Sequence, residues 1–376
     1  MSPVLARRQS SAMRTGSTQG AVLHFKADWL PASEVFVYDL VRHLKRPPVV
    51  VSHNPLQNIE RFPLADVRSL APFERFVRPV AARPLAFSTA LELLVHRRRV
   101  EVVHAHHGYR LEVLLPVIRR RGLPLVLSVH GHDVTGYLEH RPDPYREASE
   151  LVSVVVVPSN FLVQHAVAAG FDAARIRVLP SGIDTSYFCP TAIPGGEPVA
   201  LFVGRFVAKK GLDTLARAWA QVQSAVPEAR LRLLGYGPLE ETARAIRGRV
   251  SVEIAPDRRA VRDAMQAARV VVSPSHEAPD DSLESLLMVN LEAQASGRPV
   301  VTTRHGGIPE YVREDETALL VPEDDSDALA AAIVRVLRDD ELAHRLGGAG
   351  PTWAQAFDVR ATAARMDALY DELLCV

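Results

Sequence analysis

The sequence predicts an α/β protein made of two tandem, Rossmann-like, doubly wound domains that face a central cleft. Short β-branched runs alternate with helical patterns along the whole chain of 376 residues, which is typical of parallel sheets covered by helices. The alternation is interrupted once, at residues 189–198, where prolines and glycines are dense enough to indicate a linker. In such sheets ligands bind at the carboxyl ends of the strands, so we expect a site between the two domains.

The expected strands are short and rich in β-branched residues in both halves of the chain. In the first half they cover residues 21–25, 48–52, 101–105, 124–129, 152–157 and 175–179. In the second half they cover residues 199–203, 230–234, 251–254, 270–273, 299–303 and 318–321. Helical patterns between the first-half strands cover residues 34–44, 85–97, 109–121 and 160–169.

These patterns divide the chain into four segments. Residues 1–19 are rich in Ser, Arg, Thr and Gln and lack the apolar core of a signal peptide, so we expect a disordered leader. The N-terminal domain is expected at residues 20–190 and the C-terminal domain at residues 191–352. Residues 353–376 are amphipathic and predict a last helix.

The composition argues against several classes of protein. Lys and Arg together number 44, as do Asp and Glu, so the net charge is zero and argues against nucleic acid as a partner. Cys189 and Cys375 are the only cysteines, and they have neither disulfide-framework nor metal-ligand spacing. No apolar run approaches the roughly 20 residues of a membrane span. We therefore expect a reduced, cytoplasmic protein without a metal.

Two basic runs, at residues 96–99 and 119–121, leave one alternative open for the location of the protein. Basic helix ends are common on soluble proteins, and we prefer that interpretation. Such runs also attract anionic lipid, so a peripheral contact with the inner face of the cell membrane is the alternative.

The most informative stretch, residues 273–312, carries two glutamates eight positions apart. Gly297 and the Arg-Pro pair after it predict a helix end, so a helix is expected at about residues 286–296, with Glu292 inside it and Glu284 just before it. Eight helical residues rise roughly 12 Å, comparable with the distance between the ribose and the hexose of a nucleotide sugar. The two carboxylates are therefore candidates to bind hydroxyl groups at both ends of such a ligand. A solvated helix face is the alternative for the spacing alone.

Two further motifs suit phosphate. Gly306 and Gly307 follow the next expected strand and open another helix, whose N-terminus favours an anion. Gly204 and Arg205 follow the first strand of the second half, and Lys210 lies on the same loop. Cations at a strand end suit a diphosphate leaving group, whose negative charge grows as the bond to it breaks. A basic surface turn is the alternative for this loop alone.

Together these motifs resemble the signature of the family-4 retaining glycosyltransferases, nucleotide-sugar enzymes with the GT-B fold. Glu284 and Glu292 match the family's two glutamates, which have seven residues between them. Residues 306–310 match its Gly-Gly-x-Pro-Glu turn, and residues 204–211 match its Gly-Arg…Lys-Gly motif. The acidic residues before Glu284 resemble members that build exopolysaccharides of the colanic-acid type. In GT-B enzymes of this type the last helix crosses back to the N-terminal domain.

The resemblance implies roles for residues of the C-terminal domain. Arg205 and Lys210 would stabilise the donor diphosphate, with Lys209 facing solvent beside them. Glu292 would bind the ribose, and Glu284 would bind a hydroxyl of the donor sugar. The sequence departs from the family after Glu284, where Gly-x-Pro or Ser-x-Gly is frequent. The other donor-binding residues that the resemblance implies are Gly204, Gly235, Gly237, Ser275, Ser285, Leu286, Gly306 and Gly307.

In the N-terminal half, residues 130–133 follow an expected strand and resemble the family's His-Gly-x-Asp segment. The resemblance implies that His130 is catalytic and contacts the donor sugar near its reacting carbon; a core histidine with satisfied hydrogen bonds is the alternative. Asp133 is a candidate on the acceptor side. Ser33 and Glu34 are further acceptor-side candidates, because exopolysaccharide members begin their first long helix with a similar Ser-Glu-x-Phe segment.

Another run, His104, His106 and His107, resembles an upstream family element. The run invites interpretation as a metal site, but these spacings on a strand and turn do not favour a convergent tetrahedral arrangement. We therefore predict no metal at these histidines.

The sequence thus predicts a retaining, metal-independent hexosyltransferase. It would move a sugar from a nucleoside diphosphate sugar, based on UDP or GDP, to a glycan or lipid-linked glycan in exopolysaccharide or cell-surface glycan synthesis. No cofactor is expected, because the nucleotide sugar is a substrate. Two alternatives remain at this point: a nucleotide-sugar epimerase of the same fold, which needs no acceptor, and a non-catalytic nucleotide-sugar-binding subunit.

Overall fold

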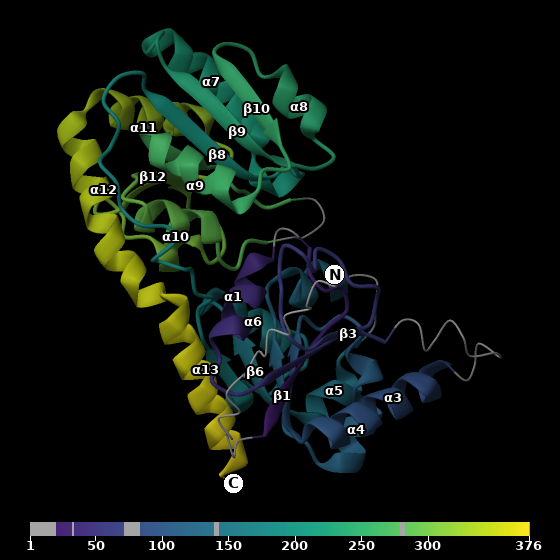
Figure 1. Ribbon diagram of the computed structural model, residues 1–376. Helices are drawn as coiled ribbons and strands as arrows, with labels where there is room; N and C mark the ends of the chain where they lie inside the picture. The colour runs from purple at the N-terminus through teal and green to yellow at the C-terminus, as the bar shows by residue number, and fades with distance from the viewer. Residues whose placement is uncertain (1–19, 32–33, 71–82, 139–142, 279–282, 376) are drawn as a thin grey trace, which may run out of the picture.

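The computed structural model describes residues 20–31, 34–70, 83–138, 143–278 and 283–375. Over these residues the chain forms two α/β domains, each with its own parallel sheet. Figure 1 shows the C-terminal domain above the N-terminal domain, with helices on both sides of each sheet. The predicted fold class is therefore confirmed. The predicted leader, residues 1–19, lies outside the described residues.

The N-terminal sheet has seven parallel strands in the order β3-β2-β1-β4-β5-β6-β7. The chain leaves the centre of the sheet first in one direction and then in the other, which is the doubly wound arrangement. The strands are β1 Ala21–Lys26, β2 Pro48–Ser52, β3 Val67–Ser69, β4 Val100–His106, β5 Leu125–Ser128, β6 Val152–Val157 and β7 Ile176–Val178.

The C-terminal sheet repeats this order with six parallel strands, β10-β9-β8-β11-β12-β13. Its strands are β8 Val199–Arg205, β9 Arg230–Tyr236, β10 Val250–Ile254, β11 Val270–Ser273, β12 Val300–Thr303 and β13 Ala318–Val321. All twelve predicted strands are present, with ends within two residues of the prediction. The strand that the sequence did not predict is β3, which has three residues, none of them buried, and so lacks an apolar pattern.

The helices pack on the two faces of each sheet. Those of the N-terminal half are α1 Val35–His43, α3 Arg83–Arg98, α4 Leu115–Arg121, α5 Arg146–Leu151 and α6 Phe161–Ala168. Those of the C-terminal half are α7 Leu212–Ala225, α8 Glu240–Ala245, α9 Arg258–Ala267, α10 Met288–Ala295, α11 Ser326–Arg338, α12 Asp340–Ala354 and α13 Val359–Leu374. The helix predicted at residues 109–121 is shorter than expected, because Arg110 has a left-handed φ of 60° and precedes a 3-10 turn.

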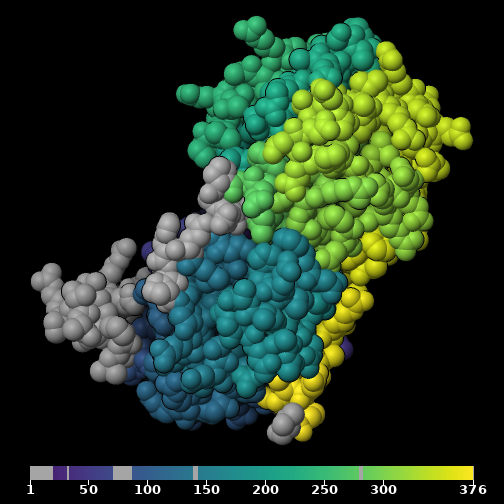
Figure 2. Space-filling view, turned by 180° about the vertical axis from the view of Figure 1, so that it is seen from behind, coloured from purple at the N-terminus to yellow at the C-terminus, as the bar shows by residue number. Residues whose placement is uncertain are grey.

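The last helix, α13, leaves the C-terminal domain and packs on the N-terminal sheet. Figure 1 shows α12 and α13 in yellow along one side of both domains, and Figure 2 shows α13 against the N-terminal domain from behind. Arg46 holds the helix by an ion pair with Asp371, 2.7 Å between Nη2 and Oδ1. The helix predicted from residue 353 is interrupted, because Asp358 is extended and separates α13 from the turn Gln355–Phe357. Buried contacts across this interface join Val22, Val102, Val126, Met366, Leu369 and Tyr370.

Arg298 ties the linker to the C-terminal domain. Its guanidinium is fully buried and donates hydrogen bonds to the carbonyl oxygens of Thr191 and Ala192 in the linker, at 3.1 Å each. It also donates to the carbonyl oxygens of Met265 and Gln266 at the end of α9. Burial lowers the pKa of Arg298 to about 10, so the group stays charged at neutral pH. A buried cation needs such partners, and here they attach the linker firmly.

We predict that Tyr370→Phe destabilises the protein by about 1–3 kcal/mol, because it leaves a buried imidazole nitrogen without a partner. The Tyr370 hydroxyl lies 2.6 Å from His104 Nδ1, and both side chains are fully buried. Urea unfolding followed by circular dichroism measures the change. Tyr38→Phe is the matched control: its hydroxyl donates to the Pro63 carbonyl over 3.4 Å at the surface, so its effect should stay within about 0.5 kcal/mol. Equal effects of the two variants would contradict the prediction.

Candidate active site

A cleft of about 660 Å³ lies between the two domains, at the carboxyl ends of strands from both sheets. This volume is in the range of small-molecule binding sites. The C-terminal domain contributes the loops after β8 and β9 and the segment that leads into α10. The N-terminal domain contributes α1 and the segments that follow β4 and β5. The site therefore lies where the strand-end rule placed it.

The centre of the C-terminal wall is an ion pair between Glu284 and Lys210. The Lys210 ammonium lies 2.8 Å from Glu284 Oε1, and both side chains are largely buried, at 13% and 7% exposure. Burial alone would raise the pKa of Glu284, but Lys210 and Lys209 hold it below its usual value. Glu284 is therefore a carboxylate at neutral pH. Lys209 was expected to face solvent, and this is wrong: it is 12% exposed and donates to the Leu283 carbonyl.

The main chain of Glu284 is held from two sides. Gly307 N–H donates to the Glu284 carbonyl oxygen over 2.8 Å, and Glu284 N–H donates to His305 Nε2 over 3.2 Å. A carboxylate oxygen of Glu323 lies 2.9 Å from His305 Nδ1. These contacts explain the glycine pair, because a Cβ at Gly306 would lie 2.2 Å from the Glu284 carbonyl oxygen. The Gly307 amide, expected to bind a diphosphate, donates to the Glu284 carbonyl oxygen here and supports the Glu284 loop.

The same loop contacts the N-terminal domain at His130. Ser285 Oγ donates to the His130 carbonyl oxygen over 2.5 Å. Gly131 lies at this contact with φ of 131°, a backbone conformation that favours glycine. A second link joins the domains nearby, where the Glu310 carboxylate accepts the backbone N–H groups of Asn160 and Phe161 at the start of α6. The last residue of the Gly-Gly-x-Pro-Glu turn thus caps a helix of the other domain.

Glu292 lies inside α10, as predicted, and lines the cleft. Burial raises its pKa to about 7, Arg258 opposes this shift and Asp39 adds to it. Arg258 also joins the domains, since its Nη2 donates to Asp39 Oδ2 over 2.8 Å. Its guanidinium lies 4.5 Å from the centre of the Tyr187 ring. Arg258 and Asp39 were not among the predicted site residues.

The remaining predicted residues of the C-terminal domain divide into two groups. Gly204, Arg205, Gly235, Ser285 and Leu286 line the cleft. The second group, outside the cleft lining, consists of Gly237, Ser275, Gly306 and Gly307. A Cβ on Gly237, whose φ is 148°, would lie 2.5 Å from the Phe206 carbonyl oxygen. Gly237 therefore permits a close turn. Ser275 is 1% exposed, and its carbonyl oxygen accepts the Thr303 hydroxyl, which holds the end of β11 against β12.

On the N-terminal side, His130 and Glu34 line the cleft, whereas Asp133 does not. Asp133 is fully buried, and its carboxylate accepts the backbone N–H groups of Gly108, His130 and Gly131 at 3.3, 2.9 and 2.9 Å. Asp133 lies behind the residues that line the N-terminal side of the cleft. It positions the loops after β4 and β5 and does not touch an acceptor. Ser33 lies outside the described residues.

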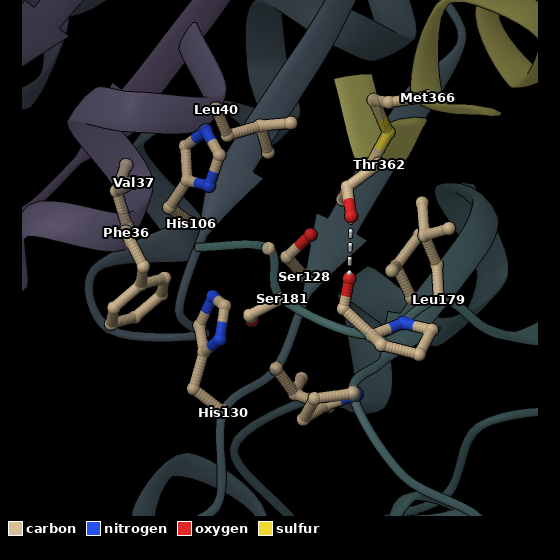
Figure 3. Close-up of a pocket in the computed structure, with 15 residues that line it drawn as sticks. Phe36, Val37, Leu40, His106, Ser128, His130, Leu179, Ser181, Thr362 and Met366 are labelled. Atoms are coloured by element: carbon tan, nitrogen blue, oxygen red, sulfur yellow. Dashed lines mark hydrogen bonds between the residues drawn. The ribbon is translucent and has the colours of Figure 1, made fainter. Parts of the chain in front are cut away.

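A small cavity of about 20 Å³ lies beside His130, between α1 and α13, and Figure 3 shows the residues that line it. Phe36 packs against the His130 ring with the ring centres 5.0 Å apart. Burial lowers the pKa of His130 well below its usual value, so the imidazole is neutral at pH 7. The ring is thus held from behind while it also lines the large cleft.

Two rings on this wall were not predicted as site residues: His107, which belongs to the histidine run of the sequence analysis, and Tyr109. Both directly follow β4, so the strand-end rule alone could have found them. The same rule could have found Arg258, because this residue is the first of α9 and follows shortly after the end of β10.

The histidine run at the end of β4 divides between two environments. His107 lines the cleft, whereas His104 and His106 are buried with His24, and their ligand atoms lie within 4.8 Å of one another. By distance alone this trio is suitable for a metal ion. However, both ring nitrogens of His104 contact hydroxyl groups, those of Ser128 and Tyr370, and His24 Nδ1 contacts His106 Nε2 at 3.1 Å. These contacts tie His104 to α13 through Tyr370, whereas the buried His24 Nε2 has no hydrogen-bond partner among the described residues.

Comparison with known proteins is consistent with this geometry. Residues 33–187 match the family described as Glycosyltransferase Family 4, and residues 197–339 match the one described as Glycosyl transferases group 1. A GDP-mannose-dependent alpha-(1-6)-phosphatidylinositol monomannoside mannosyltransferase of Mycolicibacterium smegmatis is 30% identical over 287 residues, which are 71% of this chain and 75% of that protein. The chain is a family-4 glycosyltransferase.

Two further similarities support the assignment of this chain to the glycosyltransferases. The putative colanic acid biosynthesis glycosyltransferase WcaL of Escherichia coli is 29% identical over 260 residues, which cover 65% of this chain and 64% of WcaL. The crystal structure of HepE from Anabaena in complex with UDP superposes with a TM-score of 0.76 at 20% identity, over 94% of this chain and all of that one. At that identity the superposition shows a shared fold. The GT-B fold and the predicted family are thereby confirmed.

We predict that Glu292→Gln changes how the stability of the glycosyltransferase depends on pH. Burial raises the Glu292 pKa from 4.5 to about 7, so the folded protein holds this proton more tightly than the unfolded chain. The unfolding free energy therefore falls as pH rises between these values, by about 3 kcal/mol from this group. Glu292→Gln removes that loss.

Urea unfolding at a series of pH values from 4.5 to 7 measures the effect. Subtracting the unfolding free energy of the wild type from that of the variant cancels the contribution of Asp133, whose pKa is also raised by burial. The variant should gain stability relative to wild type as pH rises. If the difference in unfolding free energy between variant and wild type does not change with pH, Glu292 titrates as an ordinary exposed glutamate.

Proposed function

We propose that this glycosyltransferase is a retaining, metal-independent enzyme that moves a sugar from a nucleoside diphosphate sugar to a hydroxyl of a glycan or lipid-linked glycan. The observation that carries the proposal is the cluster of three cations, Arg205, Lys209 and Lys210, on one wall of the cleft. Opposite them lies the neutral ring of His130. A diphosphate at the cations would direct its sugar toward that ring.

The donor class is supported by the names of relatives and of solved structures. The mycobacterial relatives are named as GDP-mannose-dependent enzymes. Structures of HepE are described in complex with UDP and with UDP-glucose. Glu292 in this chain would bind the ribose hydroxyls, and Glu284 would accept a hydrogen bond from a hydroxyl of the donor sugar.

In the proposed mechanism, the acceptor hydroxyl attacks the anomeric carbon from the face that the diphosphate leaves. The bond from the anomeric carbon to the diphosphate oxygen breaks, the bond to the acceptor oxygen forms, and the leaving diphosphate takes the hydroxyl proton. Arg205 and Lys210 stabilise the growing negative charge. His130 lines the reacting end, and closure of the two domains excludes water.

Two features of the cleft support retention without a metal. The carboxylates nearest the reacting end are engaged as ion pairs, Glu284 with Lys210 and Glu34 with Lys26, which disfavours either as a nucleophile. The three cations outnumber the single carboxylate of Glu284, and the net positive charge is of the size that a divalent ion supplies in other phosphate sites. No cofactor is needed for the proposed reaction, because the donor carries the activated sugar.

A role in cell-surface glycan synthesis is proposed from the relatives. WcaL is named for colanic acid biosynthesis, and the mycobacterial enzymes are named for a phosphatidylinositol monomannoside. Among the described residues, no helix is long and apolar enough to cross a membrane. The basic residues 96–99 and 119–121 suit anionic lipid, and contact with a membrane surface through them is part of the proposal.

The direct test is the anomeric configuration of the product. We would screen UDP- and GDP-sugars by thermal shift, incubate the one that stabilises the protein with a panel of glycosides, and record one-bond carbon–proton couplings by NMR. The product should have the anomeric configuration of the donor, and EDTA should leave the rate within about twofold.

Other results would contradict this proposal in distinct ways. An inverted product would exclude retention, and activity lost to EDTA but restored by Mg²⁺ or Mn²⁺ would exclude metal independence. Conversion of the donor sugar without any acceptor would identify an epimerase. Donor binding without turnover across the panel would identify a binding subunit.

A further inference from the structure

Two consecutive acids, Glu323 and Asp324, lie just after β13 and each contacts one histidine. Glu323 Oε1 lies 2.9 Å from His305 Nδ1, and Asp324 Oδ1 lies 2.5 Å from His276 Nδ1. None of these four residues is among those that line the cleft. Any effect that they have on a ligand is therefore exerted through the residues that they hold.

His276 contacts the main chain of the 3-10 turn Ala208–Lys210 twice. This turn carries two of the cations of the C-terminal wall, Lys209 and Lys210. His276 N–H donates to the Lys209 carbonyl oxygen over 3.0 Å, and His276 Nε2 lies 2.7 Å from the Ala208 carbonyl oxygen. The position of the turn, and with it the position of both cations, thus depends on His276.

The partners of His276 require a proton on both of its ring nitrogens. A carbonyl oxygen and a carboxylate can only accept a hydrogen bond. Nε2 must therefore donate to Ala208 and Nδ1 to Asp324, which makes the ring an imidazolium. The ring of His305 differs, because its Nε2 accepts the Glu284 N–H over 3.2 Å. Its proton is then on Nδ1 alone, and the ring is neutral.

The Asp324 carboxylate is fixed in place for this contact. Its Oδ1 also accepts the hydroxyl of Thr214 on α7 over 3.2 Å, and Thr214 is 1% exposed. Asp324 has a left-handed φ of 57°, which is costly for a residue other than glycine and is concentrated at functional sites. The His276 side chain is 13% exposed. The pair is therefore held by the segments after β11 and β13 and by α7.

The charges around His276 favour its protonated form. Partial burial lowers its pKa, but the hydrogen bonds to Asp324 and to the Ala208 carbonyl and the charges of Asp324 and Asp213 outweigh this effect. The pKa therefore lies above its usual value of 6.5. The other charged side chains on the neighbouring segments are Glu277, Glu323, Lys209, Lys210 and Glu284.

We propose that His276 and Asp324 are positioning residues for the donor diphosphate. As an imidazolium, His276 holds the turn in the place from which Lys209 and Lys210 contact the phosphates. When the ring loses a proton, one of its nitrogens faces an oxygen lone pair with a lone pair of its own, so one of its two contacts becomes repulsive. The turn then loosens, and the affinity for the donor falls as the pH rises. The inference rests on the proposed function and adds the residues that set the pH dependence of donor binding.

Calorimetric titration with a nucleotide sugar at pH values from 6 to 9 tests the inference. The probe is UDP-glucose or GDP-mannose, whichever stabilises the protein, because a doubly esterified diphosphate keeps its charge over this range. His276→Gln, which cannot take up the second proton, should bind about fivefold more weakly than wild type at pH 6 and within about twofold of it at pH 9. Glu292 and Asp133 also titrate near this range, but they are present in both proteins and cancel in the ratio of dissociation constants.

Asp324→Asn is the second variant, because it keeps the shape of the side chain and removes its charge. In its background the same comparison with His276→Gln should change at a pH about one unit lower, since the imidazolium has lost its anionic partner. If His276→Gln does not fold, NMR titration supplies the test: a histidine signal of the wild type should titrate above pH 6.5 and move to lower pH in Asp324→Asn. His344→Gln is the matched control. This exposed histidine of α12 also contacts a carbonyl oxygen, that of Asp340, and its variant should bind the donor like wild type at every pH.

The inference is overturned if the ratio of dissociation constants between His276→Gln and wild type does not change with pH, because a purely structural histidine gives the same loss at every pH. It is also overturned if Asp324→Asn leaves the midpoint of the titration in place. Failure of the wild-type protein to bind any nucleotide sugar would instead contradict the proposed function.

Discussion

The architecture of the cleft depends on one buried ion pair, between Glu284 and Lys210. Burying a lone carboxylate costs several kcal/mol, so the segment before α10 can take its place only with a cation beside it. Once Glu284 is held there, its main chain contacts Gly307 and His305, and Ser285 reaches the N-terminal domain at His130. A single compensated charge thus organises the C-terminal wall and joins it to the opposite domain.

Local patterns predicted the features of this glycosyltransferase that local physics determines. Apolar runs bounded by turn residues predicted every strand except β3, which is short and partly exposed. Gly297 predicted the end of α10, because its φ of 73° is one that glycine adopts at little cost. The spacing of Glu284 and Glu292 placed both carboxylates in the cleft. The start of α10 differed by two residues, since Leu287 is extended.

Contacts between distant segments were outside the reach of those patterns. The Gly307 amide is used by the Glu284 carbonyl, and Lys209 turns inward to Leu283, and neither contact has a local signature. Asp39 and Arg258 are separated by 219 positions yet form one ion pair between the domains. Tyr109 was not predicted as a site residue, although it follows β4. Sequence thus predicted which strand ends matter, and the structure assigned which side chains meet there.

The most direct test of the central role of the Glu284–Lys210 pair is a double-mutant cycle on nucleoside diphosphate binding by calorimetry. The proteins compared are wild type, Lys210→Met, Glu284→Gln and the double variant. We predict that each single variant weakens binding, and that the double variant is little worse than Lys210→Met alone, with a coupling energy of about 1–3 kcal/mol. Additive effects of the two substitutions would show that the residues act independently and that the pair does not organise the cleft.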